Sequence, residues 1–450
     1  MRAESPPEPS SPAPPAQSAP PAPPVSSTPS APSPPVPLGR RQLLAASAGN
    51  VAEWYDWLAY AYLSVYFADR IFPPGGGPAV LALNTFAVFA VGFAARPVGG
   101  LLIGVLADRR GRRTAMATTI TLMGAGQLAM AALPTYQQIG VASPVLLVVI
   151  RLAQGLSVGG ESTVSAVFAV ESAPAGRRGL YSSVAYVSGN LGQLLASGVA
   201  ALLAWQLTTA QMHAWGWRVA FGIGALACVA GLWIRHGTEE TLPSAVRETA
   251  RPRPFDFLRG NPREAALVVG MTLGATVVFY TWTTFLPTYA RLVVGLAPGT
   301  ALTASTVSLA FFIVLQPLAG LLSDRVGRKP LLITFGVGFT VLTVPLLGLL
   351  RDSFWSLLLI SCAGMVLLTG YTAVSGAVMA ELFPASVRTT GVGVPYALTV
   401  AAFGGTAPYL ATTLIDRGHA GWFGWYVSGL VLLSTLVYVG MRETKGVALR

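Results

Sequence analysis

The chain has 450 residues, of which 53% are hydrophobic and only 10% are charged. Soluble proteins typically carry about 25% charged residues, so this composition excludes an ordinary soluble domain and predicts an all-α membrane protein. The formal net charge of +11 would suit nucleic acid in a soluble protein. In a membrane protein it favours anionic lipid, and we expect no nucleic-acid partner.

Residues 1–38 are a low-complexity tail in which 15 residues are Pro and most of the others are Ala or Ser. Such a segment cannot bury apolar surface, so the composition predicts a disordered or polyproline II tail. It lacks the apolar stretch of a cleaved signal peptide. We interpret it as a solvated tail; a docking role for its Pro-Pro pairs is the alternative.

Apolar stretches of about 20 residues follow the tail, each long enough to cross a bilayer. The sequence predicts twelve membrane-spanning helices, near 43–68, 79–104, 114–133, 145–170, 181–205, 217–235, 265–289, 301–322, 330–350, 354–380, 391–415 and 422–440. The longest internal polar segment separates the sixth span from the seventh. We therefore expect a first six-helix bundle at 39–236, a linker at 237–263 and a second bundle with a short tail at 264–450.

The positive residues are distributed unevenly over the connections between these spans. Most Lys and Arg residues lie in the two tails and in the connections on the same side as the tails. The opposite connections hold only Arg70, Arg218, Arg291, Arg351 and Arg417. Because cytoplasmic connections carry the excess of Lys and Arg, both termini are predicted to be cytoplasmic, in a multi-pass protein of the cell membrane.

A charged turn between two spans occurs in both halves of the chain. Its first copy is Gly104–Arg113 (GVLADRRGRR), and its second is Gly320–Lys329 (GLLSDRVGRK). A second repeat joins Glu171–Arg178 (ESAPAGRR) to Glu381–Arg388 (ELFPASVR). Two halves with the same topology and the same turns are typical of two-lobed membrane carriers.

These repeated segments predict a gate. The Asp of each turn lies near a helix end, where it can accept backbone N–H bonds or meet the N-terminus of a neighbouring helix. The Arg that follows the second Gly of each turn can pair with a carboxylate of another helix, and the Glu residues of the second repeat are the candidates. The alternative is that these charges only set orientation. The predicted gating residues are Asp108, Arg112, Glu171, Arg178, Asp324, Arg328, Glu381 and Arg388.

Five ionisable residues lie at the depth of predicted spans, where they are costly and therefore mark function. They are Glu53, Asp56, Arg96, Arg151 and Glu161, all in the first half. Glu53 and Asp56 share one face of a helix, and burial together with their mutual repulsion favours protonation of one of them. We interpret them as proton carriers; a permanent ion pair with Arg96 or Arg151 is the alternative. Glu161 has two possible roles: a structural pair with a neighbouring helix, or proton handling.

Arg96 is the first candidate for binding an anion. It lies about eight residues before the cytoplasmic end of its span, roughly 12 Å into the bilayer by helical rise. A guanidinium at that depth can hold a carboxylate through two parallel hydrogen bonds. Polar and aromatic residues of other spans would complete the cavity, with packing as their alternative role. These are Tyr60, Gln154, Tyr280, Thr284, Gln316 and Tyr371.

The charged turn resembles the signature loop of the major facilitator superfamily. Further segments resemble the metabolite:proton symporter family within it, namely Gly49–Trp57, Arg96–Gly100, Arg151–Glu161, Trp215–Arg218 and Phe403–Pro408. Phe279–Thr284 is most similar to the 2-oxoglutarate permease branch. The resemblance implies twelve helices in two pseudo-symmetric bundles and an importer of a small organic acid with protons. It also implies a proton-coupling role for Arg151, whose Arg-x-x-Gln-Gly pattern is similar to the superfamily's fourth-span motif.

Other classes of function fit the sequence less well. It has no phosphate-binding loop, no His/Cys cluster with metal-ligand spacing and no nucleophile–base pair within a span, so we expect neither an enzyme nor a cofactor. A channel is disfavoured by the two-lobed repeat. We expect a monomeric symporter for 2-oxoglutarate or a related dicarboxylate. Proline or betaine, shikimate-like acids, or a non-transporting sensor on a carrier scaffold are the alternatives.

Overall fold

The computed structural model is helical, and no strand occurs in the part of the chain that it describes. The described residues are 40–110, 112–157, 170–171, 173–174, 176–236, 260–384 and 387–447. The tail at 1–38, most of the linker at 237–263 and Glu161 lie outside them.

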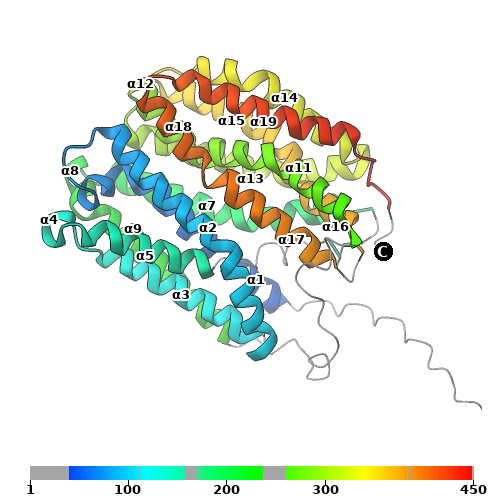
Figure 1. Ribbon diagram of the computed structural model, residues 1–450, viewed down its shortest axis with the longest axis horizontal. Helices are drawn as coiled ribbons and strands as arrows, with labels where there is room; N and C mark the ends of the chain where they lie inside the picture. The colour runs from blue at the N-terminus through cyan, green and yellow to red at the C-terminus, as the bar shows by residue number, and fades with distance from the viewer. Residues whose placement is uncertain are drawn as a thin grey trace, which may run out of the picture. The chain divides into compact units, whose positions relative to one another are not determined.

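The described residues of the first half form the long helices α1, α2, α3, α5, α7 and α9 (Figure 1). A short helix, α4, precedes α5, and the last long helix is entered through α8 and a π-helical turn, η1. The elements are α1 (Arg40–Ile71), α2 (Pro78–Arg110), α3 (Arg112–Ala132), α4 (Tyr136–Ile139), α5 (Ala142–Ser157), α7 (Arg178–Gln206), α8 (Thr209–Gln211), η1 (Met212–Gly216) and α9 (Trp217–His236).

The second half repeats this plan, with two of its spans interrupted by π-helical turns, η3 and η4. The elements are α11 (Pro262–Tyr280), η3 (Thr281–Phe285), α12 (Leu286–Val294), α13 (Pro298–Val326), α14 (Lys329–Gly348), α15 (Phe354–Thr372), α16 (Ser375–Leu382), α17 (Arg388–Thr399), η4 (Val400–Gly404), α18 (Ala407–Asp416) and α19 (Ala420–Gly440).

Where the structure describes them, the predicted spans fall on these helices or on consecutive pieces of one; residues 158–169 of the predicted span 145–170 lie outside the described residues. Nine helices among the described residues are long and apolar enough to cross a membrane. The predicted spans outside that set are α1, α3 and α5. α1 carries Glu53 and Asp56 in its middle, α3 begins with two Arg residues and carries four Thr, and α5 is described only as far as Ser157. α1 and α3 are therefore less apolar because of these polar residues, whereas the described part of α5 is apolar but too short.

The two halves pack their helices in the same pairs, as a duplicated fold requires. In the first, α1 contacts α7 and α9, α2 contacts α5, and α3 contacts α9. In the second, α11 contacts α17 and α19, α13 contacts α15, and α14 contacts α19. The halves meet through two equivalent seams, α7 against α13 and α2 against the α17–η4–α18 span. The functional residues lie near these seams.

The π-helical turn η3 provides a hydrogen bond between the halves. A π-turn shifts the backbone pairing and leaves a carbonyl available to outside donors. The Thr283 carbonyl accepts from Gln193 Nε2 at 2.8 Å and from the Tyr62 hydroxyl. Tyr62 and Gln193 belong to α1 and α7, so both donors come from the first half.

We call the end of the molecule where α13 ends and α14 begins, at residues 326–329, the turn face. The other end, with α4, α8 and the α12–α13 connection, is the opposite face (Figure 1).

Candidate functional site

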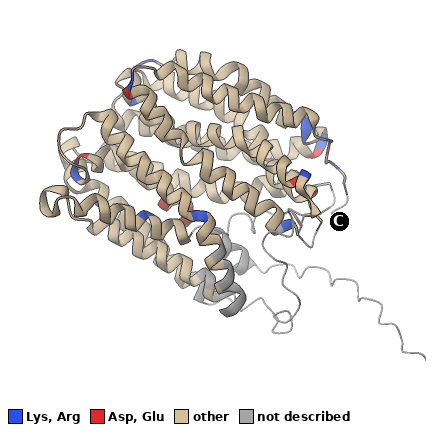
Figure 2. Cartoon of the chain, in the orientation of Figure 1, with Lys and Arg blue, Asp and Glu red and all other residues tan. Residues whose placement is uncertain are grey.

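Most charged residues lie at the ends of helices, and a small group lies midway along them (Figure 2). Within that group Asp56 is the centre of a polar cluster inside the first half. Its Oδ1 accepts from Gln127 Nε2 at 2.6 Å and from Gln154 Nε2 at 2.5 Å. Its Oδ2 is buried and has no hydrogen-bond partner among the described residues. A carboxyl group with one oxygen engaged and the other unfilled has room for a proton.

Arg151 forms a long ion pair with this carboxyl group. Its Nη2 lies 4.0 Å from Asp56 Oδ1, and both side chains are fully buried. The guanidinium lies over the ring of Tyr60, 4.2 Å from its centroid. None of its three nitrogens has a hydrogen-bond partner in the described part of the chain. Since a buried charge with unmet donors is costly, this arrangement is poised to accept a water molecule or an anion.

Arg96 lies on the other side of α1 and faces the second half. Its Cζ is 4.0 Å from the ring centroid of Trp57 and 3.9 Å from that of Phe93. Its guanidinium also interacts with the hydroxyl of Tyr280 on α11. Glu53, which is 4% exposed, is close enough to Tyr280 to act on it electrostatically. The aromatic faces hold the cation in place, and its Nε has no hydrogen-bond partner among the described residues and can bind a carboxylate.

Four tyrosines from four helices form a network that reaches this guanidinium through Tyr280 and Tyr396. The Tyr186 and Tyr396 hydroxyls interact with each other, and both tyrosines act on Tyr280. Tyr371 donates to Thr272 Oγ1 at 3.4 Å and lies within electrostatic reach of Tyr186. The cluster combines one fixed cation with several hydroxyl donors, which is the donor set for a small organic anion.

The predicted substrate-binding residues thus do not form one site but lie in separate parts of the molecule. Tyr60 and Gln154 lie beside Asp56 inside the first half, and the Tyr60 hydroxyl donates to the Thr85 carbonyl at 3.0 Å. Tyr280 and Tyr371 lie in the cluster near Arg96. Thr284 in η3 is 3.3 Å from Thr283 Oγ1, and Gln316 donates to Thr372 Oγ1 at 2.7 Å within the second half.

Sequence reasoning missed Tyr186 and Tyr396. It also missed Gln127, which donates to Asp56, and Gln193, which donates to Tyr62. For α7 a signal was available. The polar residues of α7 recur every three or four positions, at Ser183, Tyr186, Asn190, Gln193 and Ser197. That spacing marks one polar helix face, which the structure directs to α1 and α13. Tyr396 and Gln127 have no comparable pattern around them.

At the turn face Asp324 caps the helix α7 of the other half. Its Oδ1 accepts from the Gly179 backbone N–H at 2.8 Å, and its Oδ2 from that of Leu180 at 3.0 Å. Arg328 Nη1 holds the same carboxylate at 3.0 Å. The helix dipole adds to this contact, because a carboxylate at a helix N-terminus is stabilised.

Glu381 extends the contact into a buried charge cluster. It lies 3.3 Å from Arg178 Nη1 and 3.7 Å from Arg328 Nη2, and its side chain is 0% exposed. Because Arg178 belongs to the first half and the other two residues to the second, this cluster joins the halves.

A second ion pair across the halves links Arg388 on α17 to Glu171. Arg388 also donates its Nε to the Phe383 carbonyl at 3.1 Å. The pair follows the second sequence repeat, since each half supplies one member. Asp108 and Arg112 lie at the ends of α2 and α3, but their side chains are outside the described part, so their gating roles remain predictions.

The backbones at the turn face approach closely because two glycines meet. A Cβ placed on Gly179 would lie 2.7 Å from the Gly320 carbonyl oxygen and 2.9 Å from Asp324 Oδ1. Gly320 is the first residue of the second charged turn, so glycine there permits the inter-half contact.

The sequence-family model for the Major Facilitator Superfamily matches residues 57–314 and 294–449 of this chain. The chain belongs to this superfamily. The alpha-ketoglutarate permease of Escherichia coli (strain K12) is 39% identical to it, covering 91% of this chain and 94% of that protein. The proline/betaine transporter of the same strain is 29% identical, covering 90% and 84%.

Solved structures give the same fold. The D-xylose-proton symporter matches with a TM-score of 0.71 at 20% identity, over 90% of this chain and 98% of that chain. The predicted superfamily and its two-bundle helical fold are therefore confirmed. The protein is a multi-pass membrane transporter, and its relatives are transporters and not enzymes.

In this member of the superfamily the segment after the last helix extends the turn-face contacts. Glu443 accepts from the backbone N–H groups of Arg328 at 2.9 Å, Lys329 at 3.0 Å and Lys445 at 2.8 Å. Burial alone would raise the pKa of Glu443, but these N–H donors outweigh it and lower the pKa. Arg178 Nη1 donates to the Val447 carbonyl at 2.6 Å, so the segment reaches the first half.

Proposed function

We propose that this protein imports a small organic acid, 2-oxoglutarate or a related dicarboxylate, together with protons. The observation that carries the proposal is the pair of interior guanidinium groups, Arg96 and Arg151. All three nitrogens of Arg151 and the Nε of Arg96 have no hydrogen-bond partner among the described residues. The similarity to an alpha-ketoglutarate permease over nearly the whole chain supports the same class of cargo.

In the proposed cycle Arg96 binds one carboxylate of the cargo between the two bundles. The tyrosine hydroxyls would bind its remaining oxygens, and the aromatic rings would exclude water. Rocking of the bundles about this site exposes it to one side of the membrane and then to the other. Closure of the turn face by the Asp324 and Glu381 contacts corresponds to one of these states.

We propose Asp56 as the proton carrier. It lies one residue from Trp57, whose ring supports Arg96, so proton uptake and anion binding can act on the same helix. A dianion entering a cell against an inside-negative potential costs about 2.3 kcal/mol per charge at 100 mV, and accompanying protons offset this cost. From the positive-inside pattern we place both termini and the turn face in the cytoplasm.

The test is uptake of labelled 2-oxoglutarate into proteoliposomes with and without an inward proton gradient. We expect accumulation above the outside concentration only with the gradient. Arg96→Lys should abolish it, because an ammonium cannot reproduce the two parallel hydrogen bonds. Arg417→Lys, on the surface, is the matched control. Absence of 2-oxoglutarate accumulation would refute the substrate, and normal uptake by Arg96→Lys would remove Arg96 from the site.

A second candidate is an osmolyte such as proline or betaine, favoured by the relative that transports these compounds. A shikimate-like acid is a further option. Unlabelled competitors in the same assay distinguish them, since the true cargo blocks uptake at the lowest concentration. Ligand binding without any accumulation would instead indicate a sensor on a carrier scaffold.

A further inference from the structure

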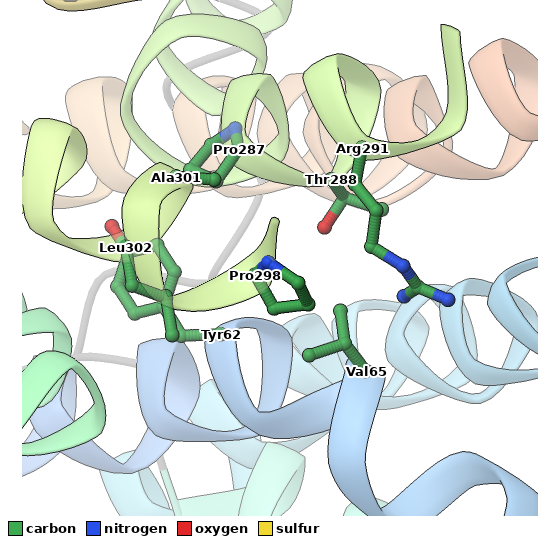
Figure 3. A pocket seen from close by; sticks show the side chains of 8 residues that line it. All are labelled: Tyr62, Val65, Pro287, Thr288, Arg291, Pro298, Ala301 and Leu302. Carbon is green, nitrogen blue, oxygen red and sulfur yellow. The ribbon is translucent and has the colours of Figure 1, made fainter. Parts of the chain in front are cut away.

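A small cleft lies between the two bundles near the opposite face (Figure 3). Its volume is about 240 Å³, including the solvent at its mouth. Most of this space is open to solvent, and the part enclosed by protein has room for a group of about the size of one water molecule. The cleft therefore takes one functional group and not a whole larger ligand. Its lining residues are Tyr62, Val65, Pro287, Thr288, Arg291, Pro298, Ala301 and Leu302.

Arg291 is the one charged residue among those that line the cleft. It lies one turn before the end of α12 and reaches toward α1, where Val65 lies (Figure 3). In the described ranges the Arg291 guanidinium forms no hydrogen bond and no ion pair. Asp69 and Tyr66 act on it only through space. Its guanidinium is therefore available to an anion.

The nearest carboxylate is already engaged. Both oxygens of Asp69 lie 3.1 Å from His213 Nδ1, and Arg70 Nε is 3.9 Å from Oδ2. An acid shared between two basic partners does not compete strongly for a third. This arrangement keeps Arg291 near negative charge without binding it.

Thr288 supplies a second polar group to the cleft. It lies one helical turn before Arg291 on the same face of α12, and its side chain is 5% exposed. Its hydroxyl is a neutral hydrogen-bond donor that an anion bound by Arg291 can reach from the same face of the helix. The Tyr62 hydroxyl is bound to the Thr283 carbonyl, so that residue contributes its ring.

We propose that Arg291 and Thr288 form an outer carboxylate-binding site, at which an organic anion docks before it reaches Arg96. The identity of the cargo as an organic acid rests on the proposed function. The preference of the cleft for anions rests on Arg291 alone. A single cation at the mouth of an inter-bundle cleft concentrates anions there and speeds their entry.

The first test is the concentration dependence of 2-oxoglutarate uptake by Arg291→Gln. Losing a charge-assisted contact should raise the apparent KM about tenfold, with the maximal rate within twofold of the parent. Arg417→Gln is the matched control, because it removes an exposed charge from the same face, outside the cleft. If Arg291 served instead to hold Asp69, Asp69→Asn would reproduce the rise in KM; under the proposal it leaves KM unchanged or lowers it.

The second test needs no knowledge of the cargo. Val65→Cys is made in a background with Cys228→Ser and Cys362→Ala, and its modification by anionic and cationic methanethiosulfonates is timed. The anionic reagent should react faster, and Arg291→Gln should reduce that preference at least threefold, as expected for one charge at close range. Arg417→Gln should not change it.

The outcomes separate the two proposals. If the parent protein does not accumulate 2-oxoglutarate but the reagent preference depends on Arg291, the proposed cargo fails and the anion site stands. If uptake and reagent preference both remain unchanged in Arg291→Gln, the outer site is refuted.

Discussion

The substitution Glu381→Gln removes one charge from the cluster that joins the halves at the turn face. It preserves shape, so it tests the charge and not the packing. In the parent, Glu381 faces Arg178 at 3.3 Å and Arg328 at 3.7 Å, and its side chain is fully buried. The glutamine oxygen can still accept one neutral hydrogen bond from Arg178.

The magnitude follows from burial and partner number. Hydrogen bonds to charged groups contribute about 1.5–3 kcal/mol each, and breaking a buried pair costs about 3–5 kcal/mol. Because Arg178 is 16% exposed and can turn toward water, we expect a net loss of about 2–4 kcal/mol. The ratio of closed to open turn face should then fall by roughly 30- to 900-fold.

The assay is the alkylation rate of a single cysteine placed at Ala380. This residue is 0% exposed and packs against Val170 and Ala377. An impermeant maleimide should therefore reach it only when the turn face opens. Asp416→Asn, an exposed acid on the opposite face, is the control. If the cysteine in Glu381→Gln is as protected as in the parent, the charge cluster does not hold this face closed.

Three further predictions follow from the same contacts. Asp56→Asn should lose uphill accumulation while keeping downhill flux, because an amide cannot carry a proton; accumulation ratios under a gradient of one pH unit should fall about tenfold per coupled proton. Glu171→Arg and Arg388→Glu should each open the turn face, and the double exchange should restore closure, giving a coupling energy of about 1 kcal/mol or more in a double-mutant cycle. Glu443→Gln should lower the thermal stability by an amount that is constant from pH 8 to pH 5. Because the folded pKa lies below the unfolded value of about 4.3, the difference should shrink only as the pH falls below that range.

The helices could be predicted because each span is a local property of the sequence. A stretch of about 20 apolar residues between charged turns is sufficient to predict a helix, and the repeat of Gly104–Arg113 in Gly320–Lys329 is sufficient to predict a duplicated fold. The polar face of α1 was visible for the same reason, since Asn50, Glu53 and Asp56 recur at helical spacing.

The side-chain contacts between helices could not be predicted from local sequence patterns. Nothing near Asp56 in the sequence indicates Gln127 on α3 as its donor, because the two residues come together only through packing. The π-turn at Thr281–Phe285 depends on donors from α1 and α7 and has no local signature. The segment from Met441 to Val447 follows the last span as a short polar tail, and only its carbonyl and carboxylate contacts reveal its place at the turn face.

The geometry indicates that α1 couples proton binding at Asp56 to anion binding at Arg96. Neither residue indicates this role alone. Asp56 points to α3 and α5, the adjacent Trp57 supports Arg96 toward the second bundle, and Tyr62 donates to η3 of that bundle. One rigid helix thus contacts the proton site, the anion site and the facing half. A carboxylate that draws Arg96 off the Trp57 ring would shift the packing of α1, and neutralising Asp56 would weaken its contact with Arg151. Both events act on the same helix, so we expect Trp57→Ala to uncouple proton from anion flux while Trp54→Ala, whose ring contacts Phe279 instead, does not.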